Sequence, residues 1–234
     1  MSDKLKKLKD ELKKAANPKQ AKLLQGFFKT GKGQYGEGDI FLGIKVPVQR
    51  AIVKKYGGMD LKEIQELLNS KIHEYRLIAL FILIKKYIKS SEEDKGKIYR
   101  FYLKNTKNIN NWDLVDLSAP NILGDYLLNK NKKILLKLVK SNNLWERRIA
   151  IISTYTFIRH NQFNETLKLA RKLLKDDHDL IHKAVGWMLR EVGNKDQKVE
   201  KSFLNKYYQV MPRTMLRYAI EKFNKKQRSF YMKK

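Results

Sequence analysis

Apolar residues recur every three to four positions along nearly the whole chain, which is the spacing of one face of an α-helix. No run alternates apolar and polar residues convincingly enough to predict a strand. The segments DKLKKLKDELKKAA and PKQAKLLQGFFK predict two opening helices, the second with Pro18 at a favoured first-turn position. About ten further helical segments follow, separated by short signals such as YGGMD, KSSEED and VGNKD. The pattern therefore predicts an all-α chain.

Four of the segments align at intervals of about 34 to 37 residues, which indicates a helical repeat. They are IHEYRLIALFIL, NINNWDLVDLSAP, LWERRIAIISTY and LIHKAVGWMLRE. The equivalent positions are Arg76, Asp113, Arg147 and Lys183, followed three residues later by Ala79, Asp116, Ala150 and Gly186. Helix pairs that repeat at this length stack into an α-solenoid that curves around a concave surface. We expect one such domain over residues 1–234, with its basic residues in the concave groove.

The second repeat differs from the others at Asp116, where the other three carry a small residue. Trp112 and Asp116 stand four residues apart and share one face of the predicted helix. One interpretation is that this repeat has been modified to build a site around a carboxylate. The other is structural, with Asp116 capping or pairing within a helix pair. The repeat pattern alone leaves both interpretations open.

The charge of the chain indicates which partners it attracts. It has 51 Lys and Arg against 24 Asp and Glu, a formal net charge of +27. Such a field attracts polyanions such as DNA, RNA or an anionic membrane surface, although lysine-rich helices can also simply be solvated. The absence of cysteine excludes disulfides, thiolate nucleophiles and cysteine zinc sites. The longest apolar run, LIALFILI, is too short to span a bilayer, so we expect a cytoplasmic protein. The repeat period and the net charge lead us to expect a monomer.

Three motifs have weaker interpretations. GKGQYG matches the G-x-G-x-x-G fingerprint of dinucleotide-binding sites but follows a predicted helix, so a connecting loop is favoured over a nucleotide site. DDHDLIH places His178 and His182 four residues apart, but acids before a helix are ordinary capping residues and no third ligand is evident. Asp113 and Asp116 form a further possible cation pair, and we expect no metal at either place.

The three tryptophans of the chain all lie in the aligned repeats. They occur in WDLVD, WERR and GWMLR, each beside charged residues. Packing in the core is the usual role of tryptophan. Successive repeats would nevertheless bring aromatic faces, a carboxylate and an arginine to the same concave groove, to which the net charge would attract DNA.

Five segments in order resemble the HEAT-like-repeat DNA glycosylases of alkylation repair, the AlkD family. They cover almost the whole chain and are FFKTGKGQYGEGDIFLGIKVP, NNWDLVD, LWERRIAI, HKAVGWMLREVGNKD and MPRTMLRYAIEKF. This family excises alkylated bases such as 3-methyladenine and 7-methylguanine by hydrolysing the N-glycosidic bond, without a metal or lyase chemistry. The resemblance implies a glycosylase that acts on alkylated double-stranded DNA, requires no cofactor and does not flip the base into a pocket.

The resemblance also implies roles for individual residues. The catalytic carboxylate falls on Asp116, the groove arginine on Arg148, and the two groove tryptophans on Trp112 and Trp187. Base alkylation at N3 or N7 creates a cationic leaving group, so the remaining task is to stabilise an oxocarbenium-like sugar, for which a fixed carboxylate and tryptophan faces are suited. Arg148 would hold a phosphate and keep Asp116 ionised.

Three further residues complete the candidate site. Arg147 and Arg190 are expected to contact DNA, and Arg147 is the neighbour with which Arg148 could be confused. The family has a tyrosine where this chain has Phe27 or Phe28, which puts a hydroxyl role there in doubt; we expect Phe27 to contact DNA. Two rival functions remain, a catalytically silent relative that binds damaged or branched DNA and a solenoid scaffold for a protein partner.

Overall fold

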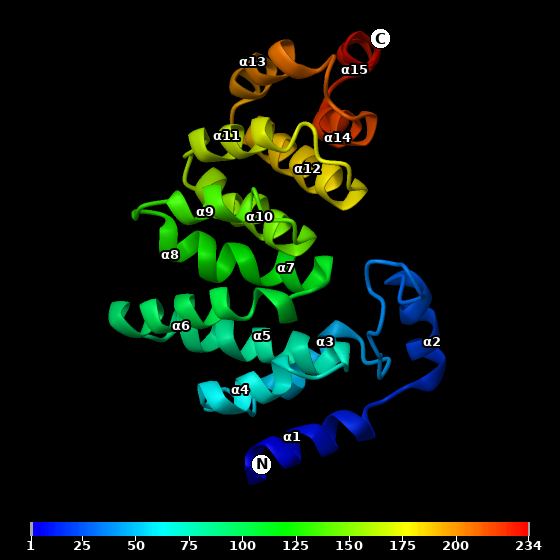
Figure 1. Cartoon of the computed structure of the whole chain (residues 1–234), viewed down its shortest axis with the longest axis vertical. Coiled ribbons are helices and arrows are strands. Elements are labelled where there is room, and N and C mark those ends of the chain that lie inside the picture. The colour runs from blue at the N-terminus through cyan, green and yellow to red at the C-terminus, as the bar shows by residue number, and fades with distance from the viewer. Residues whose placement is uncertain (1, 234) are drawn as a thin grey trace. The chain divides into compact units, whose positions relative to one another are not determined.

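The computed structural model describes residues 2–233, and helices run along most of this range (Figure 1). The described residues contain no strand, only an isolated bridge between Ile40 and Ile72. This confirms the prediction of an all-α chain of helical repeats. The chain forms two compact units that divide after Leu114, inside helix α7 (Trp112–Ala119).

The first unit is built around α5, whose sequence is apolar on nearly all sides. Its helices are α1 (Asp3–Lys14), α2 (Pro18–Phe27), α3 (Val46–Val53), α4 (Leu61–Leu68), α5 (His73–Ile88), α6 (Glu92–Lys104) and the 3-10 helix η1 (Thr106–Asn108). Helices α3, α4 and α6 all pack against α5, which explains why twelve of its sixteen residues are buried. Pro18 lies in the first turn of α2, after the capping residue Asn17, as predicted.

The loop between α2 and α3 is tied to the first turn of α5. The carboxylate of Glu74 accepts hydrogen bonds from the backbone N–H groups of Leu42, Gly43 and Ile44 at 2.8 to 3.2 Å. Gly43 has a φ of 81°, and a Cβ there would lie 2.1 Å from the carbonyl oxygen of Asn17, so only glycine fits. The GKGQYG segment lies in this loop as a series of turns, without the preceding strand that a dinucleotide site requires.

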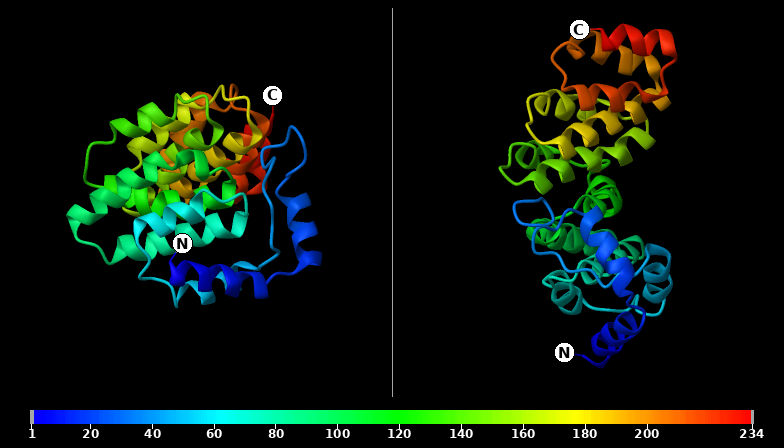
Figure 2. Two further views of the ribbon diagram at one scale, coloured as in Figure 1. Left: turned by 60° about the horizontal axis from the view of Figure 1, so that its bottom comes forward. Right: turned by 90° about the vertical axis from the view of Figure 1, so that its right-hand side faces the viewer.

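The second unit consists of two helical layers, which Figure 1 shows beside each other. One layer contains α10 (Leu144–Arg159), α12 (Asp179–Lys195) and α14 (Arg213–Ala219), with the 3-10 helix η3 (Ile220–Lys222) after it. The other contains α8 (Asp125–Leu127), α9 (Lys133–Leu138), α11 (Asn164–Lys172), α13 (Gln197–Tyr207) and α15 (Lys225–Met232). Helices α10, α12 and α14 pack in succession, and Figure 2 shows this stack from two other sides.

The small residues of the repeat allow this close stacking. Ala79 and Ala150 are fully buried in α5 and α10. A Cβ at Gly186 of α12 would lie 2.4 Å from the carbonyl oxygen of Met215 in α14, so the two helices touch backbone to backbone. Asp116, which occupies the equivalent position in the second repeat, is partly exposed.

The repeat extends to individual hydrogen bonds. Arg76 donates to the carbonyl of Ser70 at 2.8 Å, and Arg147 makes the same bond to Ser141 at 2.9 Å. Each arginine also pairs with an aspartate, Arg76 with Asp39 and Arg147 with Asp176, both at 2.6 Å. Arg147 therefore makes the bonds in its repeat that Arg76 makes in its own, and the contact of Arg147 with DNA stays a prediction.

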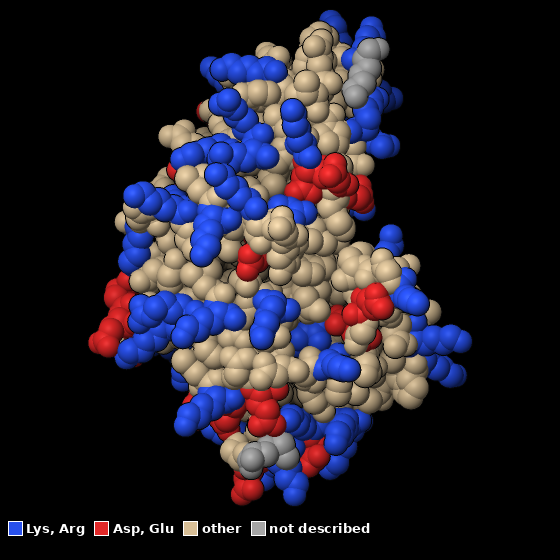
Figure 3. Space-filling model, in the orientation of Figure 1, with Lys and Arg blue, Asp and Glu red and all other residues tan. Residues whose placement is uncertain are grey.

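Basic side chains outnumber acidic ones on the visible face of both units, where they are dispersed (Figure 3). None of the helices in residues 2–233 is long and apolar enough to cross a membrane. The proposed basic concave groove depends on how the two units are placed, and it stays a prediction.

Candidate active site

The carboxylate of Asp116 is held by the guanidinium of Arg148. Arg148 Nε donates to Asp116 Oδ1 at 2.9 Å, and Nη2 donates to Oδ2 at 2.7 Å, which makes a bidentate pair. Arg148 Nη1 donates in addition to the carbonyl of Leu180, at the start of α12. The Arg148 side chain is 6% exposed and that of Asp116 is 19% exposed. A buried arginine therefore fixes a carboxylate that a ligand can still reach.

Helix α7 changes its winding one turn after Asp116. Pro120 has no N–H group and its ring would clash with the carbonyl four residues earlier, which is that of Asp116. The chain adopts the wider π-helical turn η2 over Pro120–Gly124 and then continues as α8. Thr156 of α10 donates to the carbonyl of Pro120 at 2.6 Å and holds this turn. Wide turns of this kind occur often at functional sites.

The first turn of α7 is fixed by a buried histidine. His73 is 2% exposed and lies between two carboxylates, with Nε2 2.8 Å from Asp113 Oδ2 and Nδ1 3.3 Å from Asp39 Oδ2. Asp39 also accepts from Arg76 Nη2. Asp113 thus occupies the position that Arg76 and Arg147 hold in their repeats, and it pairs with His73 of the preceding repeat.

The two carboxylates determine the charge of His73. Burial lowers its pKa, but the charge of Asp113 and the hydrogen bonds with Asp113 and Asp39 outweigh burial and the repulsion of Arg76, so the pKa is raised to about 9. Burial raises the pKa of Asp39, but His73 and Arg76 outweigh it and the net direction is down. The raised pKa of His73 favours its imidazolium form at neutral pH.

An aromatic stack connects His73 to Trp112. Phe41 stacks on the imidazole with ring centroids 4.5 Å apart, Phe28 stacks on Phe41 at 5.1 Å, and Trp112 stacks on Phe28 at 5.1 Å. Phe27 meets the edge of Trp112 at 5.8 Å. Phe28 is buried, whereas Phe27 is 64% exposed. Of the two phenylalanines considered from the sequence, Phe27 is the one that a ligand can touch.

The other two tryptophans differ in environment. Trp145 is buried in the core of the second unit. Trp187 is half-buried on α12, packs 5.9 Å from Tyr155, and donates through Nε1 to Glu191 at 3.0 Å. Arg190 pairs with Glu191 and with Glu221.

The residues considered for metal binding are engaged in other bonds. His178 accepts the N–H of Leu180 as the cap of α12, and His182 is bonded to the carbonyl of Asp176. Asp113 and Asp116 are each bonded to a cationic side chain. Within residues 2–233, no cluster of three or more His, Asp or Glu side chains has an arrangement suited to a metal ion.

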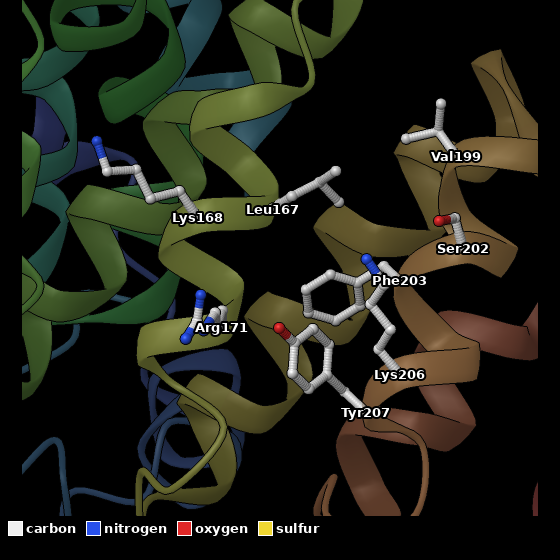
Figure 4. A pocket seen from close by; sticks show the side chains of 8 residues that line it. All are labelled: Leu167, Lys168, Arg171, Val199, Ser202, Phe203, Lys206 and Tyr207. Atoms are coloured by element: carbon white, nitrogen blue, oxygen red, sulfur yellow. The ribbon is translucent and has the colours of Figure 1, made fainter.

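A separate pocket of about 370 Å³ lies between α11 and α13 (Figure 4). Phe203 and Tyr207 from α13 and Leu167 from α11 form its apolar part, with Arg171 and Lys206 beside them. No carboxylate lines it, so it lacks the group needed to stabilise a developing cation.

Three solved structures have a fold similar to that of this chain. A predicted DNA alkylation repair enzyme from Enterococcus faecalis is 17% identical, with a TM-score of 0.71, over 90% of this chain and 97% of that one. AlkD2 from Streptococcus mutans is 19% identical, with a TM-score of 0.54, over 88% and 98%. The protein smu.31 from Streptococcus mutans UA159 is 21% identical, with a TM-score of 0.52, over 74% and 89%. No curated protein matches the chain.

These similarities concern the fold, because each identity is low. The model of the family described as "DNA alkylation repair enzyme" matches residues 8–223. This range spans both units and includes every candidate residue named above. The chain belongs to the DNA alkylation repair enzyme family.

Proposed function

We propose that the protein is a DNA glycosylase that removes N3- and N7-alkylated purines from double-stranded DNA, with Asp116 as its catalytic carboxylate. The observation that carries this proposal is the pair of Asp116 and Arg148. A carboxylate fixed by two charge-assisted hydrogen bonds, and 19% exposed, is a preorganised negative charge that a ligand can approach.

The proposed reaction requires little acid catalysis. An alkylated purine carries a positive charge, so cleavage of the bond between the sugar C1′ and the base nitrogen transfers the electron pair to the base and neutralises it. Positive charge then develops on the sugar, where Asp116 stabilises it. Water adds to C1′ and loses its proton to Asp116 or to solvent. The products are the free base and an abasic site.

The proposed contacts with DNA come from aromatic and cationic residues. The half-buried Trp112 and Trp187 and the exposed Phe27 present apolar or electron-rich faces, which attract a cationic base or sugar. Arg148, which is buried and bonded to Asp116 and to the carbonyl of Leu180, would orient Asp116. The net charge of +27 would supply the nonspecific attraction to the duplex.

A base-release assay tests the proposal. Duplex DNA treated with a methylating agent is incubated with the full chain, and free 7-methylguanine and 3-methyladenine are measured by chromatography and mass spectrometry. We expect release of both bases, at a rate that a chelator leaves unchanged because the leaving group is already cationic. Duplex binding without base release would contradict the proposal and indicate the catalytically silent DNA-binding protein.

Salt dependence separates DNA binding from a role as a protein scaffold. Contacts with phosphates release counterions, so the affinity for undamaged duplex should fall steeply as the salt concentration rises. An affinity that is undetectable at low salt would contradict any function on DNA.

A further inference from the structure

A hollow lined by lysines lies in the first unit, at the end of α5 opposite to His73. It has a volume of about 550 Å³ and is formed by the C-terminal ends of α3 and α5 and by the Gly57–Gly58 turn. Five lysines line it: Lys54, Lys55, Lys85, Lys86 and Lys89. Helix α5 has sixteen residues, so roughly 24 Å separates its two ends. The hollow is therefore separate from the His73 cluster, and none of its lining residues belongs to the candidate active site.

Most of these lysines have no ion-pair partner among the described residues, although the charge of Lys86 also acts on Asp94, which pairs with Lys97. Lys55 pairs with Glu11 at 2.6 Å, and Tyr56 donates to the same carboxylate, so Glu11 is already engaged. The other four lysines of the hollow form no ion pair with any residue in the range 2–233. Their ammonium groups repel one another, and an anion in the hollow would relieve that repulsion.

Two of these lysines are partly withdrawn from solvent. Lys85 and Lys86 are half-buried, and each donates to a backbone carbonyl at 3.4 Å, Lys85 to Lys54 and Lys86 to Met59. An ammonium group has three donors, so these long bonds leave donors for a ligand. Lysines at the C-terminal ends of α5 and α3 also match the negative ends of the two helix dipoles. Lys54 comes from the end of α3 and faces the same hollow.

We propose that this hollow binds a run of linked phosphate groups. Several ammonium groups around an open hollow suit an extended anion with several charges better than a single compact one. The ligand class includes the phosphodiester strand of a nucleic acid and free inorganic polyphosphate, which share this chemistry. The proposal does not depend on the proposed glycosylase activity because its probes contain no damaged base.

The test uses two triple variants of the full chain. The hollow variant carries Lys54→Gln, Lys85→Gln and Lys89→Gln. The control variant carries Lys6→Gln, Lys13→Gln and Lys107→Gln, which remove the same charge from exposed positions that do not line the hollow. Binding of tripolyphosphate and of undamaged single-stranded and duplex DNA is measured by calorimetry at low salt. Circular dichroism establishes whether each variant folds. If the hollow variant unfolds, a double variant with Lys54→Gln and Lys89→Gln replaces it, because that variant leaves the half-buried Lys85 intact.

We expect the hollow variant to bind tripolyphosphate roughly tenfold more weakly than the control variant, because several phosphate contacts are lost together. An equal loss of DNA affinity identifies a nucleic-acid strand as the ligand. Loss of tripolyphosphate binding alone identifies free polyphosphate. Equal affinities of the hollow and control variants for all three probes would overturn the proposal and leave the lysines as partners of the helix dipole.

Discussion

Arg147 and Arg148 are neighbours in the chain, but their guanidinium groups have different partners. Arg147 bonds to Ser141 and Asp176. Arg76, two repeats earlier, bonds to Ser70 and Asp39 in the same way. Arg148 instead holds Asp116 with two bonds. A pairwise comparison of sequences can confuse the two arginines, whereas the geometry assigns one to the repeat and the other to the carboxylate.

Conservative substitutions should separate these two arginines. Lysine cannot make the bidentate pair, so Arg148→Lys should leave Asp116 poorly oriented and reduce base release by about tenfold or more. Arg147→Lys should lower thermal stability and leave the rate per folded molecule nearly unchanged. Single-turnover kinetics and thermal denaturation of both variants measure these effects. A larger loss of rate in Arg147→Lys would contradict the assignment.

His73 should make the stability of the first unit depend on pH. Its pKa is raised to about 9 in the folded chain, so the stabilisation is fully present below the ordinary histidine pKa and is lost as the pH rises through 9. The total effect is on the order of 3 kcal/mol. Asp39, Asp113 and Arg76 are the charged groups that face it.

His73→Gln keeps a hydrogen-bonding side chain but removes the charge. We expect this variant to be less stable than the parent at pH 6 and to lose less stability between pH 7 and pH 9.5. Melting temperatures across this range provide the measurement. Parallel curves for the parent and the variant would show that His73 is not charged in the folded state.

Some features of helix α7 could be predicted from the sequence and others could not. The repeat pattern predicted the helix and the exceptional position of Asp116, since an acid replaces a small residue there. The pattern did not predict the partner of Asp113, because contact with His73 depends on packing between residues forty positions apart. The wide turn after Asp116 had a signal in Pro120, which in an α-helix would clash with the Asp116 carbonyl.

The stacking of α12 on α14 should tolerate no side chain at Gly186. Gly186→Ala places a methyl group 2.4 Å from the Met215 carbonyl oxygen, so the helices must separate at a cost of about 1 to 3 kcal/mol. Gly26→Ala is the matched control, because Gly26 is also helical but has no neighbour within 4 Å, and alanine there should stabilise α2 by roughly 0.5 to 1 kcal/mol. Chemical denaturation measures both changes. Equal effects would contradict the close contact.

At the scale of the whole molecule, the helical repeats and the excess of basic residues were predicted from periodicity and composition. The division into two units after Leu114 was not, because apolar periodicity continues through α7 without a linker. The first unit contains the aromatic stack and Phe27, and the second contains Asp116, Arg148 and Trp187.

The central claim is that Asp116 supplies the negative charge for base excision. The most direct measurement is the single-turnover release of 7-methylguanine from methylated duplex DNA by the parent and by Asp116→Asn, which keeps the shape and removes the charge. We expect the rate to fall about a hundredfold or more, equivalent to roughly 3 kcal/mol, while duplex binding stays level or tightens. Asp113→Asn, which affects the His73 cluster, should reduce the rate much less. Release at the parental rate by a folded Asp116→Asn protein would contradict the claim.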